Sequence, residues 1–474
     1  MQEEQQELEN LSAAELVEES AVPGRSSRLD GAVFFLLCVI LIFSVLAYGA
    51  VETWAFGFIS IFTGLITVFW LADAWFNKEL KIATSLLQIP LFGLILIGFV
   101  QLLPLRSPDV SGGLLSIPAV SSLSINPYAT RLMVVQLIIY AVFFAAVFVF
   151  INSPQRLRKI VAVVVIFGAI MAFFGILQRL ASSEGIYGWR PTPQAIPFAS
   201  FVNQHHFAAF MEMTIGLTLA LLVGKGTDKD KRVLLIIAII LMGIAILFTG
   251  SRGGLLSLLG VLGFVIFTNF LRQGNSGEAV SKDEKRARFR RNIALVGGGI
   301  ALILVLFGAL VLLGGDASLV RGIGFTNQAD VSSGRLHFWS VALQTFKDYP
   351  ILGAGLDAFG TAFPQYDTWN GSFRVEQAHN DYLQTLADAG ILGFICVVSF
   401  VFLLFKQGLR RIGAEHSHFR RSVAIGALAG CFGILLHSFF DFPLRTASNG
   451  FYFLLLTALA TVPIAFPKHR QRTK

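Results

Sequence analysis

Two arginines and one histidine are the residues of this chain whose types and surroundings best suit the binding of a phosphorylated substrate. Arg252 lies in a glycine-rich break between two apolar segments, where missing side chains let a ligand approach the backbone closely. An arginine at membrane depth is costly and tends to face the protein interior or a water-filled cavity. We therefore expect Arg252 to bind condensed negative charge; the alternative is an interfacial arginine that extends its charge to the membrane surface.

Arg335 is the second candidate for an anion site. Ser332 or Ser333 could cap a short helix that holds Arg335 near its start. A helix N-terminus and a guanidinium together suit a phosphate, because both donate hydrogen bonds to it. The alternative is an ordinary exposed loop arginine.

His379 marks the point where a long loop returns to an apolar segment that begins near Gly390. An imidazole titrates near neutral pH, and it could hydrogen-bond a phosphate or take a proton from an acceptor hydroxyl. Leu383 lies one helical turn further on and could pack beneath it. The alternative is a capping or core histidine, and the pattern does not separate a proton acceptor from a hydrogen-bond donor.

A second group of residues suits substrate binding: Asn203, His205, His206 and Arg445. Adjacent histidines point to different sides of a helix, so we expect no joint metal site, and one of the two should face the cavity. For several charged residues ion pairing within the helix bundle is the expected role; these are Glu376, Asp381, Asp441 and again Arg445.

The elements that must position these residues are membrane helices. Hydrophobic residues make up 55% of the 474 positions and charged residues only 14%, so water is not the main solvent of the chain. Apolar runs of about 17–25 residues recur, each long enough to cross a hydrocarbon core, and in lipid such runs must be helical. Twelve spans are predicted, near residues 32–50, 55–76, 87–103, 132–151, 160–179, 205–223, 233–248, 254–271, 293–313, 390–405, 422–439 and 450–466.

Basic residues set the predicted orientation. Lysine and arginine gather in alternate loops, as the excess of positive charge on the cytoplasmic side requires, so both termini are expected in the cytoplasm and the candidate residues at the periplasmic face of a bacterial inner membrane. The net charge of +8 follows from this pattern. It needs no nucleic-acid partner, because the basic clusters lack interleaved stacking aromatics.

One external loop is far longer than the connections usual between helices. It runs from about residue 314 to 389 and is rich in glycine and aromatic residues, which indicates a folded cap with short helices. The predicted organisation is a disordered cytoplasmic tail (1–30), transmembrane helices 1–9 (31–313), a large periplasmic loop with catalytic elements (314–389), transmembrane helices 10–12 (390–467) and a basic cytoplasmic tail (468–474).

Residues 198–445 resemble the O-antigen ligase and polymerase superfamily of bacterial membrane glycosyltransferases. The segments that carry the resemblance are 201–207, 250–253, 334–355, 379–390 and 441–445. The resemblance implies an all-α polytopic membrane protein with a GT-C-like fold. It also implies that Arg252 and Arg335 bind the pyrophosphate of a glycan carried on undecaprenyl pyrophosphate, and that His379 activates the acceptor or orients the donor.

The activity implied by this resemblance is a metal-independent, inverting transfer of the glycan to a hydroxyl of a lipid or glycan acceptor, in the synthesis of lipopolysaccharide O-antigen or exopolysaccharide. No cofactor is expected, because guanidinium groups can neutralise the charge that grows on a pyrophosphate leaving group. Ligase and polymerase forms share this chemistry, and the sequence does not distinguish them.

Two other function classes stay open. A transporter or flippase for an anionic lipid-linked substrate fits twelve spans, but it would need ionisable residues near the bilayer midplane, and here the candidates gather at one face. A non-catalytic scaffold would tolerate loss of Arg252, Arg335 and His379. Walker, zinc-finger and serine-hydrolase motifs are not found in the sequence.

Overall fold

The computed structural model describes residues 27–106, 121–181, 185–192, 195–224, 226–275, 334–369, 371 and 374–464. Within these residues the regular structure is helical, apart from two isolated β-bridges. Eight helices are long and apolar enough to cross a membrane, and three further apolar helices are shorter. The prediction of an all-α polytopic membrane protein is confirmed.

The apolar helices follow the predicted spans. They are α2 (Arg28–Leu46), α3 (Thr53–Asn77), α4 (Gln88–Gln101), α5 (Pro127–Phe150), α6 (Pro154–Leu180), α7 (Gln204–Val223), α8 (Arg232–Thr249), α9 (Arg252–Asn275), α14 (Asp381–Ala414), α15 (His418–His437) and α16 (Ala447–Thr461). The predicted span at 293–313 lies outside the described residues, and each of the others overlaps one of these helices.

Helix ends differ from the predicted limits because capping residues extend the helices beyond their apolar runs. Ser27 caps α2 through the backbone N–H of Asp30, so the last residues of the predicted tail at 1–30 are helical. Asn126 caps α5 in the same way, through the N–H of Ala129. Side-chain oxygens at these positions accept hydrogen bonds that the first helical turn cannot satisfy itself.

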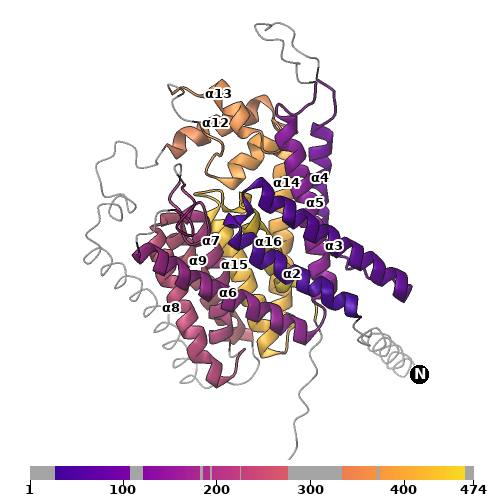
Figure 1. The fold of residues 1–474 in the computed structure, drawn as a ribbon, viewed down its shortest axis with the longest axis vertical. Coiled ribbons are helices and arrows are strands. Elements are labelled where there is room, and N and C mark those ends of the chain that lie inside the picture. The colour runs from indigo at the N-terminus through magenta and orange to yellow at the C-terminus, as the bar shows by residue number, and fades with distance from the viewer. Residues whose placement is uncertain are drawn as a thin grey trace, which may run out of the picture.

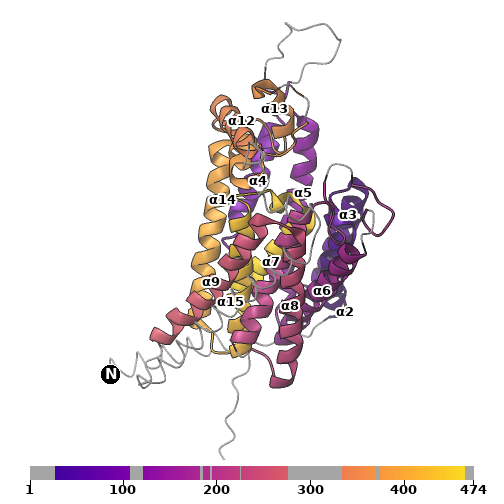
Figure 2. The same ribbon diagram turned by 90° about the vertical axis from the view of Figure 1, so that its left-hand side faces the viewer.

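The centre of the bundle is formed by α7 and α15. They lie between the other helices in both views (Figures 1 and 2). Within their most apolar 18-residue stretches, 83% of α7 and 78% of α15 is buried. Glycines bring the two backbones together, since a Cβ added to Gly216 would lie 2.7 Å from the backbone nitrogen of Gly430. Small residues at a helix interface allow this close packing where lipid supplies no hydrophobic driving force.

Two short helices form a cap at one end of the bundle, next to the upper ends of α5 and α14 (Figures 1 and 2). They are α12 (Arg335–Asp348) and α13 (Phe359–Tyr366). The cap has a small core of its own, in which Val341 of α12 packs with Phe359 and Phe363 of α13. The short helices predicted within the large loop are therefore present.

Gly390 divides α14 into a nine-residue segment, beginning at Asp381, and a long transmembrane segment. Its φ of +62° is a left-handed conformation, and a Cβ there would lie 2.4 Å from the carbonyl oxygen of Ile351. Only glycine adopts this conformation so close to another backbone without strain. The predicted loop boundary at residue 389 thus falls on a kink rather than on the start of a helix.

Buried polar groups tie the cap to the bundle. The side-chain amide of Gln101, at the end of α4, donates to the carbonyl oxygens of Leu352 and Asp388 and accepts from the N–H of Leu356. The carboxylate of Asp388 accepts from the N–H of Phe359, at the start of α13, over 2.9 Å. The position of the cap is therefore fixed from α4 and α14 together.

Candidate active site

The start of α14 pairs with the chain that follows α15. The N–H of Asp381 donates to the carbonyl oxygen of Ser438 over 3.0 Å, and the hydroxyl of Ser438 donates to the Asp381 carboxylate over 2.8 Å. The side-chain amide of Asn380 also donates to the carbonyl oxygen of Phe439. Because these bonds align the two segments, His379 comes to lie beside Asp441.

The carboxylate of Asp441 is shared by two of the predicted catalytic residues. Its Oδ1 lies 3.1 Å from Nδ1 of His379, and its Oδ2 lies 3.5 Å from Nη2 of Arg335. The Asp441 side chain is 2% exposed, whereas those of His379 and Arg335 are 31% and 29% exposed. The Asp441 carboxylate is thus buried beneath the side chains of His379 and Arg335, which remain partly exposed to solvent.

The charge state of Asp441 follows from these contacts. Burial by itself raises the pKa of Asp441, but the hydrogen bond from His379 and the electrostatic interaction with the neighbouring histidines outweigh it and hold the pKa well below its usual range. An ionised carboxylate accepts hydrogen bonds only, so Nδ1 of His379 carries the proton in this pair. Nε2 is then the ring nitrogen left to contact a ligand.

The ring of His379 is held between two phenylalanines. Phe442 meets it edge-on at a centroid distance of 4.8 Å, and Phe338 of α12 lies 5.8 Å away. The backbone of His379 has a φ of +51°, in the left-handed region that residues other than glycine rarely adopt. Such local strain is maintained only where surrounding contacts determine it, as the hydrogen bonds of Asn380 and Asp381 do here.

Arg252 is the first residue of α9, directly after a tight turn. Gly250 ends α8 with a φ of +63°, which reverses the chain between the two helices. A Cβ on Gly253 would lie 2.9 Å from the ring of His437 and 3.6 Å from Cβ of Phe440, so the turn packs against the same segment that carries Asp441. The Arg252 side chain is exposed and forms no ion pair with any described residue.

Several helix N-termini lie around residues 438–446, the segment that follows α15. Arg335 begins α12, Arg252 begins α9, and α14 and α16 begin directly beside residues 438–446. The N-terminal end of α7 is also close, since Nδ1 of His206 lies 2.6 Å from Oγ1 of Thr446. Each of these ends carries partial positive charge and unsatisfied backbone N–H groups, so the face as a whole suits an anionic ligand.

The family model for O-antigen ligase matches residues 237–398. The match covers about a third of the chain, and over this region the chain is similar to O-antigen ligases. No curated protein matches it by sequence. The matched region includes Arg252, Arg335 and His379, which the structure gathers around the segment that follows α15.

The matched region contains all three predicted catalytic residues, while Asp441 lies outside it. The sequence alone gave Asp441 only a role in ion pairing. It does form ion pairs, but its partners are His379 and Arg335 rather than a residue of the bundle. The signal that could have found it is an aspartate directly after a membrane helix at the same face as the other candidates.

The two histidines at the start of α7, His205 and His206, have different environments. His206 is buried, with its ring edge-on to Phe442 at 4.7 Å and its Nδ1 bonded to Thr446. His205 stays partly exposed and is one of the groups that lower the pKa of Asp441. His205 is therefore the histidine of the pair that is open to a ligand. Asn203 caps α7, with its Oδ1 accepting from the N–H of His205.

The remaining expectations concern the cluster formed by Asp441, His379, Arg335 and Arg252, and the residues around this cluster. Arg335 does begin a helix, with Gly334 at the N-cap position, while Ser332 and Ser333, the expected capping residues, lie outside the described residues. Arg445 forms ion pairs with Asp357 at 3.1 Å and Asp388 at 2.6 Å. Glu376 is exposed and pairs with Arg374, away from Asp441.

A buried acid–base pair lies under the cluster, and sequence reasoning did not identify it. Oε1 of Glu212 in α7 lies 2.9 Å from Nδ1 of His437, the last residue of α15, and both side chains are at most 1% exposed. The carbonyl oxygen of His437 accepts from the N–H of Asp441 over 3.1 Å. The pair thus anchors the segment that presents Asp441. Among the described residues, no group of three or more histidine, cysteine, aspartate or glutamate side chains is placed to hold a metal ion.

Proposed function

We propose that this protein transfers a glycan from undecaprenyl pyrophosphate to an acceptor hydroxyl at the periplasmic face of the bacterial inner membrane, in the synthesis of a surface polysaccharide. The match of residues 237–398 to the family model for O-antigen ligase supports a ligase or polymerase of this kind. The observation that carries the proposal is the convergence of Arg335 and His379 on the carboxylate of Asp441, beside the turn that presents Arg252.

The pyrophosphate would bind at the positively charged face. Arg252 and Arg335 both begin helices, so each guanidinium stands next to backbone N–H groups that also favour an anion. Arg252 has no acidic partner among the described residues, and Arg335 lies at a long 3.5 Å from Asp441. Both guanidinium groups therefore keep hydrogen-bond donors for phosphate oxygens, with His205 close by.

His379 would act on the acceptor. The Asp441 carboxylate holds the proton on Nδ1, so Nε2 can accept the proton of the acceptor hydroxyl as its oxygen attacks the anomeric carbon of the donor sugar. The new glycosidic bond forms as the bond from the anomeric carbon to the pyrophosphate oxygen breaks. The pyrophosphate leaves with that electron pair, on the opposite face of the sugar, which inverts the anomeric configuration.

Charge stabilisation would supply much of the rate. Negative charge grows on the leaving pyrophosphate, where the two arginines are already positioned. Removing one such donor typically lowers kcat by roughly 10²–10³-fold. Asp441 and the Glu212–His437 pair act through other residues in this scheme, so they are positioning residues, and Arg445 holds the cap in place through Asp357 and Asp388.

The test is complementation of a gene deletion with Arg252→Ala, Arg335→Ala and His379→Ala, with lipid-linked donor measured in parallel. We expect each variant to reach the membrane, to restore no surface polysaccharide and to let the donor accumulate. Matched controls are Arg374→Ala and His416→Ala, because these exposed residues lie outside the cluster. Wild-type polysaccharide in all three variants would exclude the proposal.

The same deletion distinguishes the two forms of the reaction. A ligase deletion leaves long lipid-linked chains, whereas a polymerase deletion leaves single repeat units. Labelling of single cysteines at Arg374 and His416 tests the orientation, since the two residues lie at opposite ends of α14. We expect a membrane-impermeant thiol reagent added from the periplasm to reach position 374 and not position 416; the reverse would place the cluster in the cytoplasm.

A further inference from the structure

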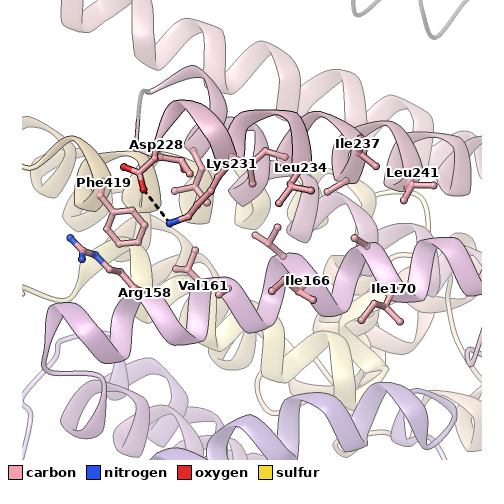
Figure 3. A pocket seen from close by; sticks show the side chains of 18 of the residues that line it. Arg158, Val161, Ile166, Ile170, Asp228, Lys231, Leu234, Ile237, Leu241 and Phe419 are labelled. Carbon is pink, nitrogen blue, oxygen red and sulfur yellow. Dashed lines mark hydrogen bonds and ion pairs between the residues drawn. The ribbon is translucent and has the colours of Figure 1, made fainter.

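A long groove runs between α6 and α8 (Figure 3), and none of its lining residues belongs to the candidate active site. It encloses a volume of about 720 Å³ and is lined along most of its length by aliphatic side chains of the two helices. Ile166 and Ile170 of α6 face Leu234 and Ile237 of α8 across it. These side chains are 48–66% exposed, which is stable for helices of this hydropathy only when lipid covers them.

The groove has one polar end. Arg158 and Lys231 lie there, with Asp228 and Phe419, in the left part of Figure 3. The guanidinium of Arg158 lies over the ring of Phe419 at 5.6 Å and has no acidic partner among the described residues. Lys231 pairs with Asp228 at 3.1 Å, but both side chains are more than 60% exposed, so water screens this pair and it contributes little.

The position of the polar end within the bundle shows which leaflet it faces. Arg158 lies in the first turns of α6, and Lys231 directly precedes α8. The other ends of the two helices, near Leu180 and Thr249, lie on the side of Arg252 and the candidate active site. The polar end of the groove is therefore at the opposite membrane surface from the proposed reaction.

The groove is longer than the hydrocarbon depth of one leaflet, so it can hold the acyl chain of a lipid in that leaflet. From Arg158 to Phe173, α6 rises by roughly 22 Å at about 1.5 Å per residue. One leaflet occupies about half of a hydrocarbon core of roughly 30 Å. An acyl chain can thus lie along the aliphatic walls while its headgroup stays at the basic end.

We propose that this groove is a binding site for an anionic phospholipid, with the lipid phosphate at Arg158 and Lys231 and an acyl chain between α6 and α8. Basic pockets between membrane helices select anionic headgroups in this way, because two cationic side chains neutralise the phosphate while the chain buries apolar surface. The proposal is independent of the proposed function, since none of its residues belongs to the cluster around Asp441.

The experiment uses the full-length protein in nanodiscs that contain phosphatidylcholine and a trace of photoactivatable lipid, with the reactive group on an acyl chain. The probe is phosphatidylglycerol in one arm and phosphatidylcholine in the other, and the cross-linked residues are mapped by peptide mass spectrometry. We expect phosphatidylglycerol to label α6 and α8 around Ile166, Ile170, Leu234 and Ile237 in preference to phosphatidylcholine.

The variant that tests headgroup recognition is Arg158→Gln with Lys231→Gln. Each basic side chain near a membrane surface contributes about 1 kcal/mol to the binding of anionic lipid. The double variant should therefore reduce the preference for phosphatidylglycerol by about thirtyfold, while the groove remains apolar. The matched control, Lys406→Gln with Arg410→Gln on α14, removes the same charges at the same end of the bundle and should keep the preference.

Three results would overturn the proposal. Equal labelling of the groove by both lipids would mean that the basic end recognises no headgroup. Absence of lipid labelling, together with cross-links between the groove and residues 276–333 of this chain, would mean that protein fills it. A control variant that loses the preference as completely as the groove variant would show a general charge effect instead.

Discussion

Asp441 lies 3.1 Å from the imidazole of His379, although 62 residues separate the two along the chain. The same carboxylate also pairs with Arg335, so one buried charge orients both a proposed proton acceptor and a proposed phosphate ligand. Removing that charge should therefore impair catalysis more than substrate binding, because binding also depends on Arg252.

The variant Asp441→Asn keeps the size of the side chain but can no longer fix the proton on Nδ1 of His379. We expect kcat for glycan transfer to fall by roughly 10²–10⁴-fold, with a small change in KM for the lipid-linked donor. Transfer by purified protein gives both constants. The control is Asp367→Asn, which breaks the His337–Asp367 pair at 2.7 Å outside the cluster and should keep most of kcat. Equal losses in the two variants would contradict a specific role for Asp441.

Asp441 should also make the stability of the folded protein depend on pH. Its pKa in the folded protein is below that of an unfolded aspartate, about 3.9, so its contribution to stability is complete well above that pKa and is lost progressively as the pH falls below about 5. Below about pH 5 the wild type should therefore lose thermal stability faster than Asp441→Asn, while the two curves run parallel from pH 6 to 8. If the stability curves of the two proteins ran parallel over the whole pH range, the lowered pKa of Asp441 would be contradicted. Thermal unfolding in detergent provides the measurement.

Arg445 should stabilise the protein by holding the cap to the bundle. Its guanidinium occupies two carboxylates, one on Asp357 and one on the buried Asp388. Removing one partner of a buried pair typically costs about 3–5 kcal/mol, so Arg445→Gln should lower the melting temperature strongly. Adding Asp388→Asn should restore part of the loss, because it removes the uncompensated charge. If Arg445→Gln instead keeps the stability but raises KM for the donor, Arg445 binds substrate.

The turn before α9 should tolerate a change at Gly250 better than one at Gly253. Gly250→Asn keeps access to the left-handed conformation, and no atom lies within 4 Å of the added Cβ. Gly253→Ala places its Cβ 2.9 Å from the ring of His437, which is itself held by Glu212. We expect Gly253→Ala to shift the turn and raise KM for the donor through Arg252, with Gly250→Asn close to wild type. Steady-state kinetics of the two variants would separate these effects, and the opposite order would be inconsistent with the packing.

The sequence by itself determined that this is a helical membrane protein, because hydropathy is a local property that each apolar run displays independently of the others. It also led to the prediction that Arg252, Arg335 and His379 form a catalytic site, since charged residues at a membrane surface are few and each stands out. The start of α14 was predicted too late in the chain because Asp381 and its neighbours are polar. Their helical conformation depends on Asn380 as a cap and on hydrogen bonds to Ser438.

Only the tertiary structure decided which groups act together. The partners of His379 and Arg335, the burial of His206 rather than His205, and the pair of Glu212 with His437 all join residues from different helices. Such contacts depend on how the helices pack, and packing is set by small residues such as Gly216 and Gly430 and by backbone hydrogen bonds between segments far apart in the chain. The sequence gives the type of each side chain, but an ion pair also depends on the distance between two side chains. Only the folded structure sets that distance.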